Sequence, residues 1–365
     1  MSTTISSDNR DNTAGGTFKK NAGLILLLIV MIIFPFIIAL FDGQSVVDVL
    51  SGETGSAKFL QGLLIEVFIL AIFALSYDLV LGITGLLSFG HAMFFATGAY
   101  FTGIAFKTLD LGLAATLAGI VIIGLLQALL FGIVLPRVKG ITFALVTLGF
   151  ASVFFIIIQA SELAEWTGAD VGLQGVIVPE VINTTNERYR LYLIALLSVF
   201  VIYLIYRRFV DSPTGRVCVA TRENEDRALM LGFNTFHFKL VALIVSSITA
   251  AYAGFLHTVH QPIVSPNVAG LAWTVAALLI ILIGGVGTLS GAIIGAAVFR
   301  LLEFYLDKWF GENASFLLGL LYIAIVLFLP FGIVGTWRAR APRMKEGWER
   351  LLNLFTGGEK KTTNK

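Results

Sequence analysis

Charge and cysteine are both scarce in this sequence of 365 residues. Only 13% of the residues are charged, against 57% that are hydrophobic. The single cysteine, Cys218, excludes an intramolecular disulfide and argues against a metal site built from cysteines. With a mean hydropathy of +0.89, the composition lies outside the range of soluble domains and predicts a chain that faces lipid.

The sequence also lacks the motifs that commonly carry covalent chemistry. No segment reads G-x-x-x-x-G-K-[ST], so we expect no ATP and no other cofactor on this chain. The glycine-rich "GGVGTLSG" at 284–291 follows an apolar run instead of a strand, which argues against a dinucleotide loop. His257 and His260 form an H-x-x-H pair without an acidic or cysteine neighbour in sequence. We therefore predict no metal site, no catalytic residue and no enzymatic activity.

Long apolar runs take the place of such motifs. The first, Gly23 to Phe41, carries no charge and is long enough to cross a hydrocarbon core. It is too long for a signal peptide, and no small-residue cleavage site follows it. Further runs predict spans at 60–80, 87–106, 112–135, 141–160, 191–206, 240–258, 270–286, 289–304 and 316–335. The predicted fold class is all-α, a polytopic membrane protein with about ten segments.

Two of these spans, 87–106 and 289–304, begin with glycine-rich sequence. A broken or re-entrant helix is therefore an alternative to a simple crossing at both places.

Lysine and arginine set the predicted orientation. With the N-terminus in the cytoplasm, nineteen of the 25 basic residues fall in inner segments and five in outer loops. Both termini are then cytoplasmic, and the acidic loop 161–190 is the longest external one. We predict three parts, namely a disordered cytoplasmic tail at 1–22, a transmembrane domain at 23–335 and a basic cytoplasmic tail at 336–365. A cytoplasmic loop at 207–239 belongs to the middle part.

A few polar residues interrupt the spans and are candidates for a solute path, because charge inside a membrane is costly. Glu66 lies inside the second span, and Asp78 lies near its inner end. We assign Asp78 a structural role, whereas for His91 a structural role and a place in the path are equally open. Thr142 and Thr147 punctuate an apolar helix, where hydroxyls usually bond to their own backbone but a few face a solute.

Small residues in the spans predict close helix contacts, since glycine lets another helix approach closely in lipid. Two sets are predicted to serve such packing: Gly85, Gly90 and Gly98 around the third span, and Gly287, Gly291 and Gly295, spaced by four, at the ninth.

A compact charged stretch, "TRENEDRALMLGFNTFHFKL" at 221–240, stands out in so apolar a chain. Asn224 suits a helix N-cap, the acidic pair after it suits a first turn, and Gly232 suits a stop. We expect a short helix at 225–231 with charge on one side and apolar residues on the other. Two helical turns are not stable alone in water, so this helix needs a surface to dock against.

Four stretches together resemble the permease subunits of ATP-binding-cassette importers, and more closely the branched-chain amino acid permease family of the LivM type. They are "GRVCVATRENEDRALMLGFNTFHFKL", "ALSYDLVLGITGLLSFGHAMFFATGAY", "VKGITFALVTLGF" and "ILIGGVGTLSGAIIGA". The resemblance covers roughly residues 60 to 335. Importers of the wider superfamily carry E-A-A-x-x-x-G in the cytoplasmic loop, where this chain has Asp226, Arg227 and Ala228 followed by Gly232, so two of the four positions depart from the pattern.

The resemblance implies that 225–231 is a coupling helix that contacts an ATPase subunit. The residues implied in this contact are Glu225, Asp226, Arg227, Ala228, Leu229, Leu231 and Gly232. The chain would supply half of a pathway for branched-chain or related amino acids in the prokaryotic cytoplasmic (inner) membrane. The implied partners are a second homologous permease, two ATPase subunits that bind the ATP, an extracytoplasmic solute-binding protein and membrane lipid, with no nucleic acid.

Two other functions stay open on the sequence alone. Permeases for urea or short amides share these motifs, and an external binding protein, not this chain, usually selects among such substrates. From a different class, a stand-alone secondary transporter or channel would move its solute without ATP.

Overall fold

The computed structural model describes residues 14–41, 43, 55–182 and 188–337. Within these ranges the chain forms helices and no strand, and one isolated antiparallel bridge joins Leu173 to Val264. Seven stretches of the described chain are long and apolar enough to cross a membrane, judged by length and composition. The predicted all-α fold class is therefore confirmed.

Ten long helices form the body of the molecule. They are α1 (Ala14–Phe41), α3 (Ser56–Tyr77), α4 (His91–Lys107), α5 (Leu113–Gly132), α6 (Ile141–Gln159), α8 (Arg188–Asp211), α11 (Thr235–His260), α12 (Leu271–Gly284), α13 (Leu289–Phe310) and α14 (Ala314–Phe328). Each coincides with one predicted span. Helix α1 begins ahead of the expected Gly23, and residues 1–13 and 338–365 of the two predicted tails lie outside the described residues.

The possible breaks fall between helices and not within them. A π-helix, η1 (Asp78–Ile83), continues α3, and non-helical backbone then leads to Gly90 before α4 begins. Helices α4 and α13 each run without interruption. The glycine-rich sequence thus supplies two irregular connections, at 84–90 and at 285–288, next to continuous helices.

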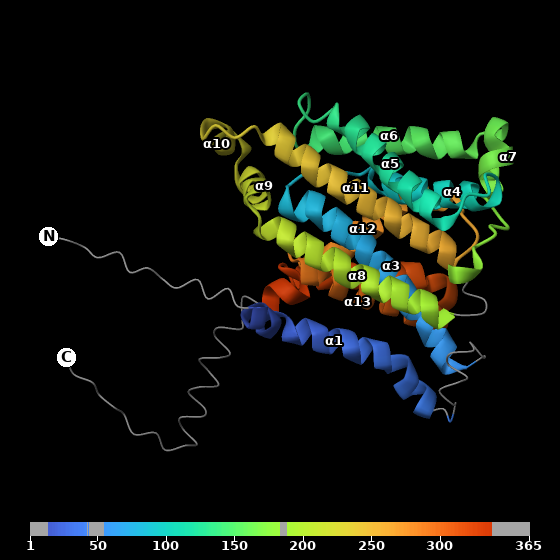
Figure 1. The fold of residues 1–365 in the computed structure, drawn as a ribbon. Coiled ribbons are helices and arrows are strands. Elements are labelled where there is room, and N and C mark those ends of the chain that lie inside the picture. Colours follow the sequence, from blue (N-terminus) through green and yellow to red (C-terminus); the bar gives the residue numbers. More distant parts are fainter. Residues whose placement is uncertain (1–13, 42, 44–54, 183–187, 338–365) are drawn as a thin grey trace, which may run out of the picture.

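Helix α3 lies at the centre of the bundle, and α1 lies along one side of it (Figure 1). In the stretch around α3, 83% of the best apolar window is buried inside the molecule, against 11% for α1. Peripheral helices expose large aliphatic side chains such as Leu26, Ile122 and Ile156. An apolar periphery around a buried central helix is what a bundle solvated by lipid requires.

Glycines set the closest helix crossings. A Cβ on Gly98 of α4 would lie 2.0 Å from the carbonyl oxygen of Ala251 in α11. A Cβ on Gly295 of α13 would lie 2.1 Å from the carbonyl oxygen of Ile280 in α12. In both crossings only a residue without a side chain lets the backbones approach so far.

The two loops of opposite charge lie at opposite ends of the bundle (Figure 1). Helices α9 (Pro213–Glu223) and α10 (Glu225–Met230) project from one end, and α7 (Ala164–Thr167) lies at the other. This separation is what the basic-residue argument requires if one end faces the cytoplasm.

Candidate functional site

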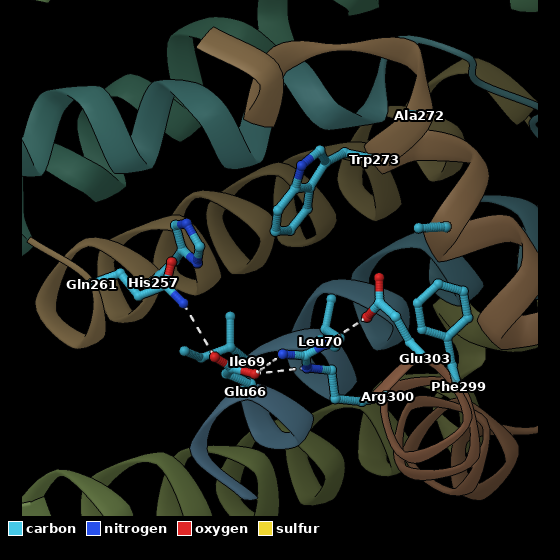
Figure 2. Close-up of a pocket in the computed structure, with 11 residues that line it drawn as sticks. Glu66, Ile69, Leu70, His257, Gln261, Ala272, Trp273, Phe299, Arg300 and Glu303 are labelled. Atoms are coloured by element: carbon cyan, nitrogen blue, oxygen red, sulfur yellow. Dashed lines mark hydrogen bonds and ion pairs between the residues drawn. The ribbon is translucent and has the colours of Figure 1, made fainter. Parts of the chain in front are cut away.

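A cavity of about 360 Å³ opens between α3, α11, α12 and α13 (Figure 2). Its lining mixes charged, aromatic and aliphatic side chains: Glu66, Ile69, Leu70, His257, Gln261, Ala272, Trp273, Ala276, Phe299, Arg300 and Glu303. This volume lies in the range typical of small-molecule sites, about 300–1,000 Å³. The cavity is therefore large enough for a small solute.

Three ionised side chains form one edge of the cavity. Arg300 donates through Nε and Nη2 to Oε2 of Glu66, over 2.6 and 2.5 Å, and through Nη1 to Oε2 of Glu303 over 2.7 Å. The side-chain amide of Gln261 donates to the other oxygen of Glu66 over 3.1 Å. Each charge thus has an opposite neighbour, which is the condition for holding charge within membrane spans.

Helical spacing brings these groups to the same cavity. Glu66 shares one face of α3 with Ile69 and Leu70, three and four residues further on. Arg300 and Glu303 are likewise three residues apart on α13. Because each helix contributes one such face, the cavity is a product of helix packing and not of a local motif.

Of the predicted path residues, only Glu66 lines this cavity. His91 is fully buried, with its Nε2 lying 2.9 Å from Oγ of Ser76, and its ring packs against Phe73, Tyr77 and Phe94. Thr142 is exposed near the start of α6. In this conformation His91 and Thr142 do not meet the charged edge.

Thr147 serves the start of α4. The first turn of α4 has no side-chain cap from Gly90, so its amide groups need other acceptors. The hydroxyl of Thr147 accepts from the Phe89 amide over 3.2 Å, and that of Thr274 accepts from the Ala92 amide over 2.9 Å. Helix α12 therefore supplies a cap for α4 through Thr274, and α6 holds the residue before Gly90 through Thr147.

The histidine pair divides between two environments. His257 packs against Phe95 and Trp273, whereas Nε2 of His260 lies 3.7 Å from the carboxylate of Glu66. Across the ranges that the structure describes, no three His, Cys, Asp or Glu side chains gather in a metal-binding arrangement.

Sequence reasoning missed most of the cavity. Arg300 is a basic residue within a predicted span, and Glu303 follows it about one helical turn later. Two charged residues on one face of a span predict a functional role, because charge inside a membrane is costly. Gln261 and Trp273 gave no such signal, because amide and aromatic residues are common at span ends.

The charged stretch forms a second candidate site at the opposite end of the bundle. Asn224 caps α10 as predicted, with its side chain accepting from the Arg227 amide over 2.9 Å. The helix ends at Met230, one residue before the predicted end, and Gly232 follows with φ of +85°. This left-handed backbone favours glycine and turns the chain toward α11.

Helix α10 is held on one side and open on the other. Ala228 is buried, and Glu225 bonds to Nζ of Lys239 over 2.5 Å and to the hydroxyl of Thr235 over 3.0 Å. Burial alone raises the pKa of Glu225, but the hydrogen bond and charge of Lys239, with smaller effects of the Thr235 hydrogen bond and the Lys139 charge, hold the pKa below its usual range. Four apolar side chains stay exposed at the tip: Leu229, Met230, Leu231 and Phe233. We call these four residues the α10 tip.

A polar contact links this end to the central helix. Arg222, at the end of α9, donates through Nη1 to the carbonyl oxygen of Gly82 in η1. Asp78 accepts from the amide of Gly287 over 2.7 Å, which ties η1 to the 285–288 connection. Gly287 has φ of +75°, and a Cβ there would lie 2.8 Å from Arg222. We call these four residues the Arg222 link.

The other predicted packing glycines lie at these connections. A Cβ on Gly85 would meet Arg222 at 2.9 Å, one on Gly90 would meet the Thr147 carbonyl oxygen at 2.2 Å, and one on Gly291 would meet the Gly284 carbonyl oxygen at 2.7 Å. Gly291 and Gly295 thus face α12 of the same chain, so their packing serves the fold of this chain.

The fold and the cavity define a multi-pass helical membrane protein with a charged site between its spans. Residues 59–328 match the family model described as branched-chain amino acid transport system / permease component. This chain belongs to that family, and the resemblance inferred from the sequence is confirmed. No solved structure matches the chain.

Curated relatives agree with the family match. The chain is 28% identical over 357 residues to the high-affinity branched-chain amino acid transport system permease protein LivM of Salmonella typhimurium, covering 91% of this chain and 79% of the relative. LivM of Escherichia coli is 28% identical over 360 residues, with the same coverage. LivH of Salmonella typhimurium is 26% identical over 286 residues, covering 73% of this chain and 91% of the relative.

Proposed function

We propose that this chain is a permease subunit of an ATP-binding-cassette importer for branched-chain or related amino acids. The observation that carries the proposal is the family match over 59–328, with relatives named as branched-chain amino acid permeases. The exposed α10 tip supports it, because a short helix with an apolar surface needs a docking partner.

The proposed topology has ten crossings, both termini in the cytoplasm and α10 on the cytoplasmic side of the prokaryotic inner membrane. Ten long helices and the opposite placement of α7 and α10 support it. The excess of basic residues in the segments at the α10 side gives the direction.

The proposed assembly contains a second, homologous permease, two ATPase subunits and an external solute-binding protein. Similarity to both LivM and LivH relatives supports a permease pair. The ATPases bind the ATP, so this chain carries no cofactor and performs no covalent step.

In the proposed mechanism, closure of the ATPases moves α10 and the spans reorient. Helices α9 and α10 are joined at Asn224, two residues after Arg222. The Arg222 link then transmits displacement to η1 and to the 285–288 connection. Because η1 continues α3, the motion reaches the helix that carries Glu66.

The test separates docking from transport in the reconstituted complex. We expect Met230→Asp with Leu231→Asp to weaken ATPase retention, because the ATPase contact would have to desolvate new charges. Gly232→Val should leave insertion and substrate capture by the binding protein intact but uncouple ATP hydrolysis from uptake, since valine resists a φ of +85°.

Ile177→Asp is the matched control, because Ile177 is equally exposed but lies near the opposite end. If both α10 variants retained the ATPase and imported leucine normally, the stretch would be an ordinary loop. Leucine uptake by the purified chain without ATP would favour a stand-alone transporter, and import of urea in place of leucine would favour the amide permeases.

A further inference from the structure

The charged edge of the cavity holds one negative charge in excess, counting Glu66, Arg300 and Glu303. Glu303 is the most accessible of the three, with 38% of its side chain exposed against 21% for Glu66 and 24% for Arg300. In Figure 2 one oxygen of Glu303 meets Arg300 while the other points away from it. The edge can therefore receive a cationic group.

Helix packing alone gives little reason for this cluster. A buried ion pair is a weak source of stability, because desolvation offsets most of the attraction. Helix α3 already meets α13 through Phe59 and Phe304, whose ring centroids lie 5.2 Å apart, and α13 meets α12 through the close crossing at Gly295. The helices therefore do not need Glu66, Arg300 and Glu303 in order to pack. Three charged residues inside the spans without a packing role indicate a site for a ligand.

The rest of the cavity is suited to an aliphatic group. Ile69, Leu70, Ala276 and Phe299 line it beside the charged residues. A neighbouring cavity shares His257, Gln261 and Trp273 and reaches the loop after α11. A solute can thus enter from the α7 end with its charged head toward Arg300 and its tail toward Phe299.

We propose that Glu66, Arg300 and Glu303 form a passage site that binds the charged head of a free amino acid by exchange of ion pairs. The α-carboxylate takes the place of Glu66 on Arg300, and the α-ammonium binds the carboxylates of Glu66 and Glu303. Two opposite charges enter, the Glu66–Arg300 pair breaks and new pairs form with the zwitterion, so each of the three side chains again faces an opposite charge. This inference rests on the proposed function and names the residues that act in it.

Because binding requires an exchange of ion pairs, the site should bind amino acids and not neutral amides. Urea carries no charge that could replace either partner of the Glu66–Arg300 ion pair, so the ion pair would stay intact and urea would not bind there. The exchange also keeps affinity low, because the Glu66–Arg300 pair must break before the new pairs form. Low affinity suits a site through which solute passes on the way from the binding protein.

The test uses the reconstituted complex with its binding protein and measures initial rates of leucine uptake. We expect Glu66→Gln with Arg300→Gln to assemble and to hold the ATPase, because the two glutamines form a neutral pair and Glu303, which loses Arg300, is 38% exposed. Maximal uptake should fall about tenfold or more. The leucine concentration for half-maximal uptake should stay unchanged, since the binding protein captures the substrate.

Glu303→Gln provides a milder variant that keeps the Glu66–Arg300 pair, and we expect it to lower maximal uptake as well. Glu312→Gln, an exposed carboxylate beyond α13 and outside the cavity, is the matched control and should import at the wild-type rate. Normal uptake by the neutral double variant would overturn the inference and leave the proposed function standing. A wild-type complex that imports urea and not leucine would overturn the proposed function itself.

Discussion

At the scale of single residues, polar groups in the spans have two kinds of partner. Thr147 and Thr274 satisfy backbone amides at the start of α4, and His91 meets Ser76 among aromatic rings. Glu66 and Arg300 meet each other at the wall of a cavity. The residue types alone do not separate these roles, because the neighbouring helix decides which one applies.

Gly98 provides a residue-scale prediction. Alanine there would place its Cβ 2.0 Å from the Ala251 carbonyl oxygen, so α4 and α11 would have to separate. We expect Gly98→Ala to destabilise the chain by about 1–3 kcal/mol, the usual range for overpacking. Thermal unfolding in detergent would measure it. Gly319→Ala, where an added Cβ would meet no neighbouring element within 4 Å, is the control and should not lower the unfolding temperature. Equal unfolding temperatures for both variants would contradict the crossing.

At the scale of elements, the segment 207–239, predicted to be a cytoplasmic loop, proves to be largely helical. Helix α9 starts where the Ser212 side chain accepts from the Gly215 amide and Pro213 fills the first position. Asn224 then interrupts the helix and caps α10. Both caps follow standard sequence preferences. What those preferences do not reveal is that α9 packs against the bundle and reaches η1 through Arg222.

The Arg222 link predicts a coupling variant. We expect Arg222→Gln to retain the ATPase through the unchanged α10 tip but to lower leucine uptake per ATP hydrolysed several-fold, because η1 loses its contact with α9. Uptake and hydrolysis measured on the same vesicles give this ratio. Arg216→Gln removes an exposed arginine from the same helix and should keep the wild-type ratio. A wild-type ratio for Arg222→Gln as well would exclude the link from coupling.

The ion pair of α10 predicts a pH dependence. The pKa of Glu225 is held below its usual range, so its bonds to Lys239 and Thr235 are complete at neutral pH. Their stabilisation is lost as the pH falls below the ordinary glutamate pKa and through the lowered one. We expect amide exchange in α10, corrected for the intrinsic effect of pH, to speed up on acidification. Glu225→Gln should abolish this response, whereas Glu223→Gln should preserve it. An unchanged response in Glu225→Gln would assign the pH effect to another group.

At the scale of the whole molecule, the bundle keeps the proposed ATPase-docking surface apart from the cavities through which a solute would enter. The α10 tip lies at one end, and the neighbouring cavities reach toward the loops at the other. Helix α3 carries Glu66 at its middle and continues into η1, which contacts α9 through Arg222. The Arg222 link and this continuous helix thereby join the α9–α10 end to the proposed passage site.

Thiol labelling tests the orientation of this bundle. Cys218 is buried, and burial raises its pKa to about 11, so the native thiol should not react with a membrane-impermeant maleimide. In a Cys218→Ser background, we expect Met230→Cys to react only after the cells are opened, because 86% of Met230 is exposed at the end that the proposed topology places in the cytoplasm. Ile177→Cys should react in intact cells. The reverse pattern would invert the topology.

The sequence by itself determined the helical class, the apolar segments that form the long helices, the cap and stop of α10, and the resemblance to branched-chain amino acid permeases. These features depend on local periodicity, span length and short motifs, all of which involve residues that are close together in the sequence. Only the tertiary structure decided that Arg300 meets Glu66, that Thr274 caps α4, and that Arg222 meets η1. Each of these contacts joins residues from different helices. The physical reason is that helix rotation and crossing, set by glycine contacts and side-chain packing, choose which polar residues meet.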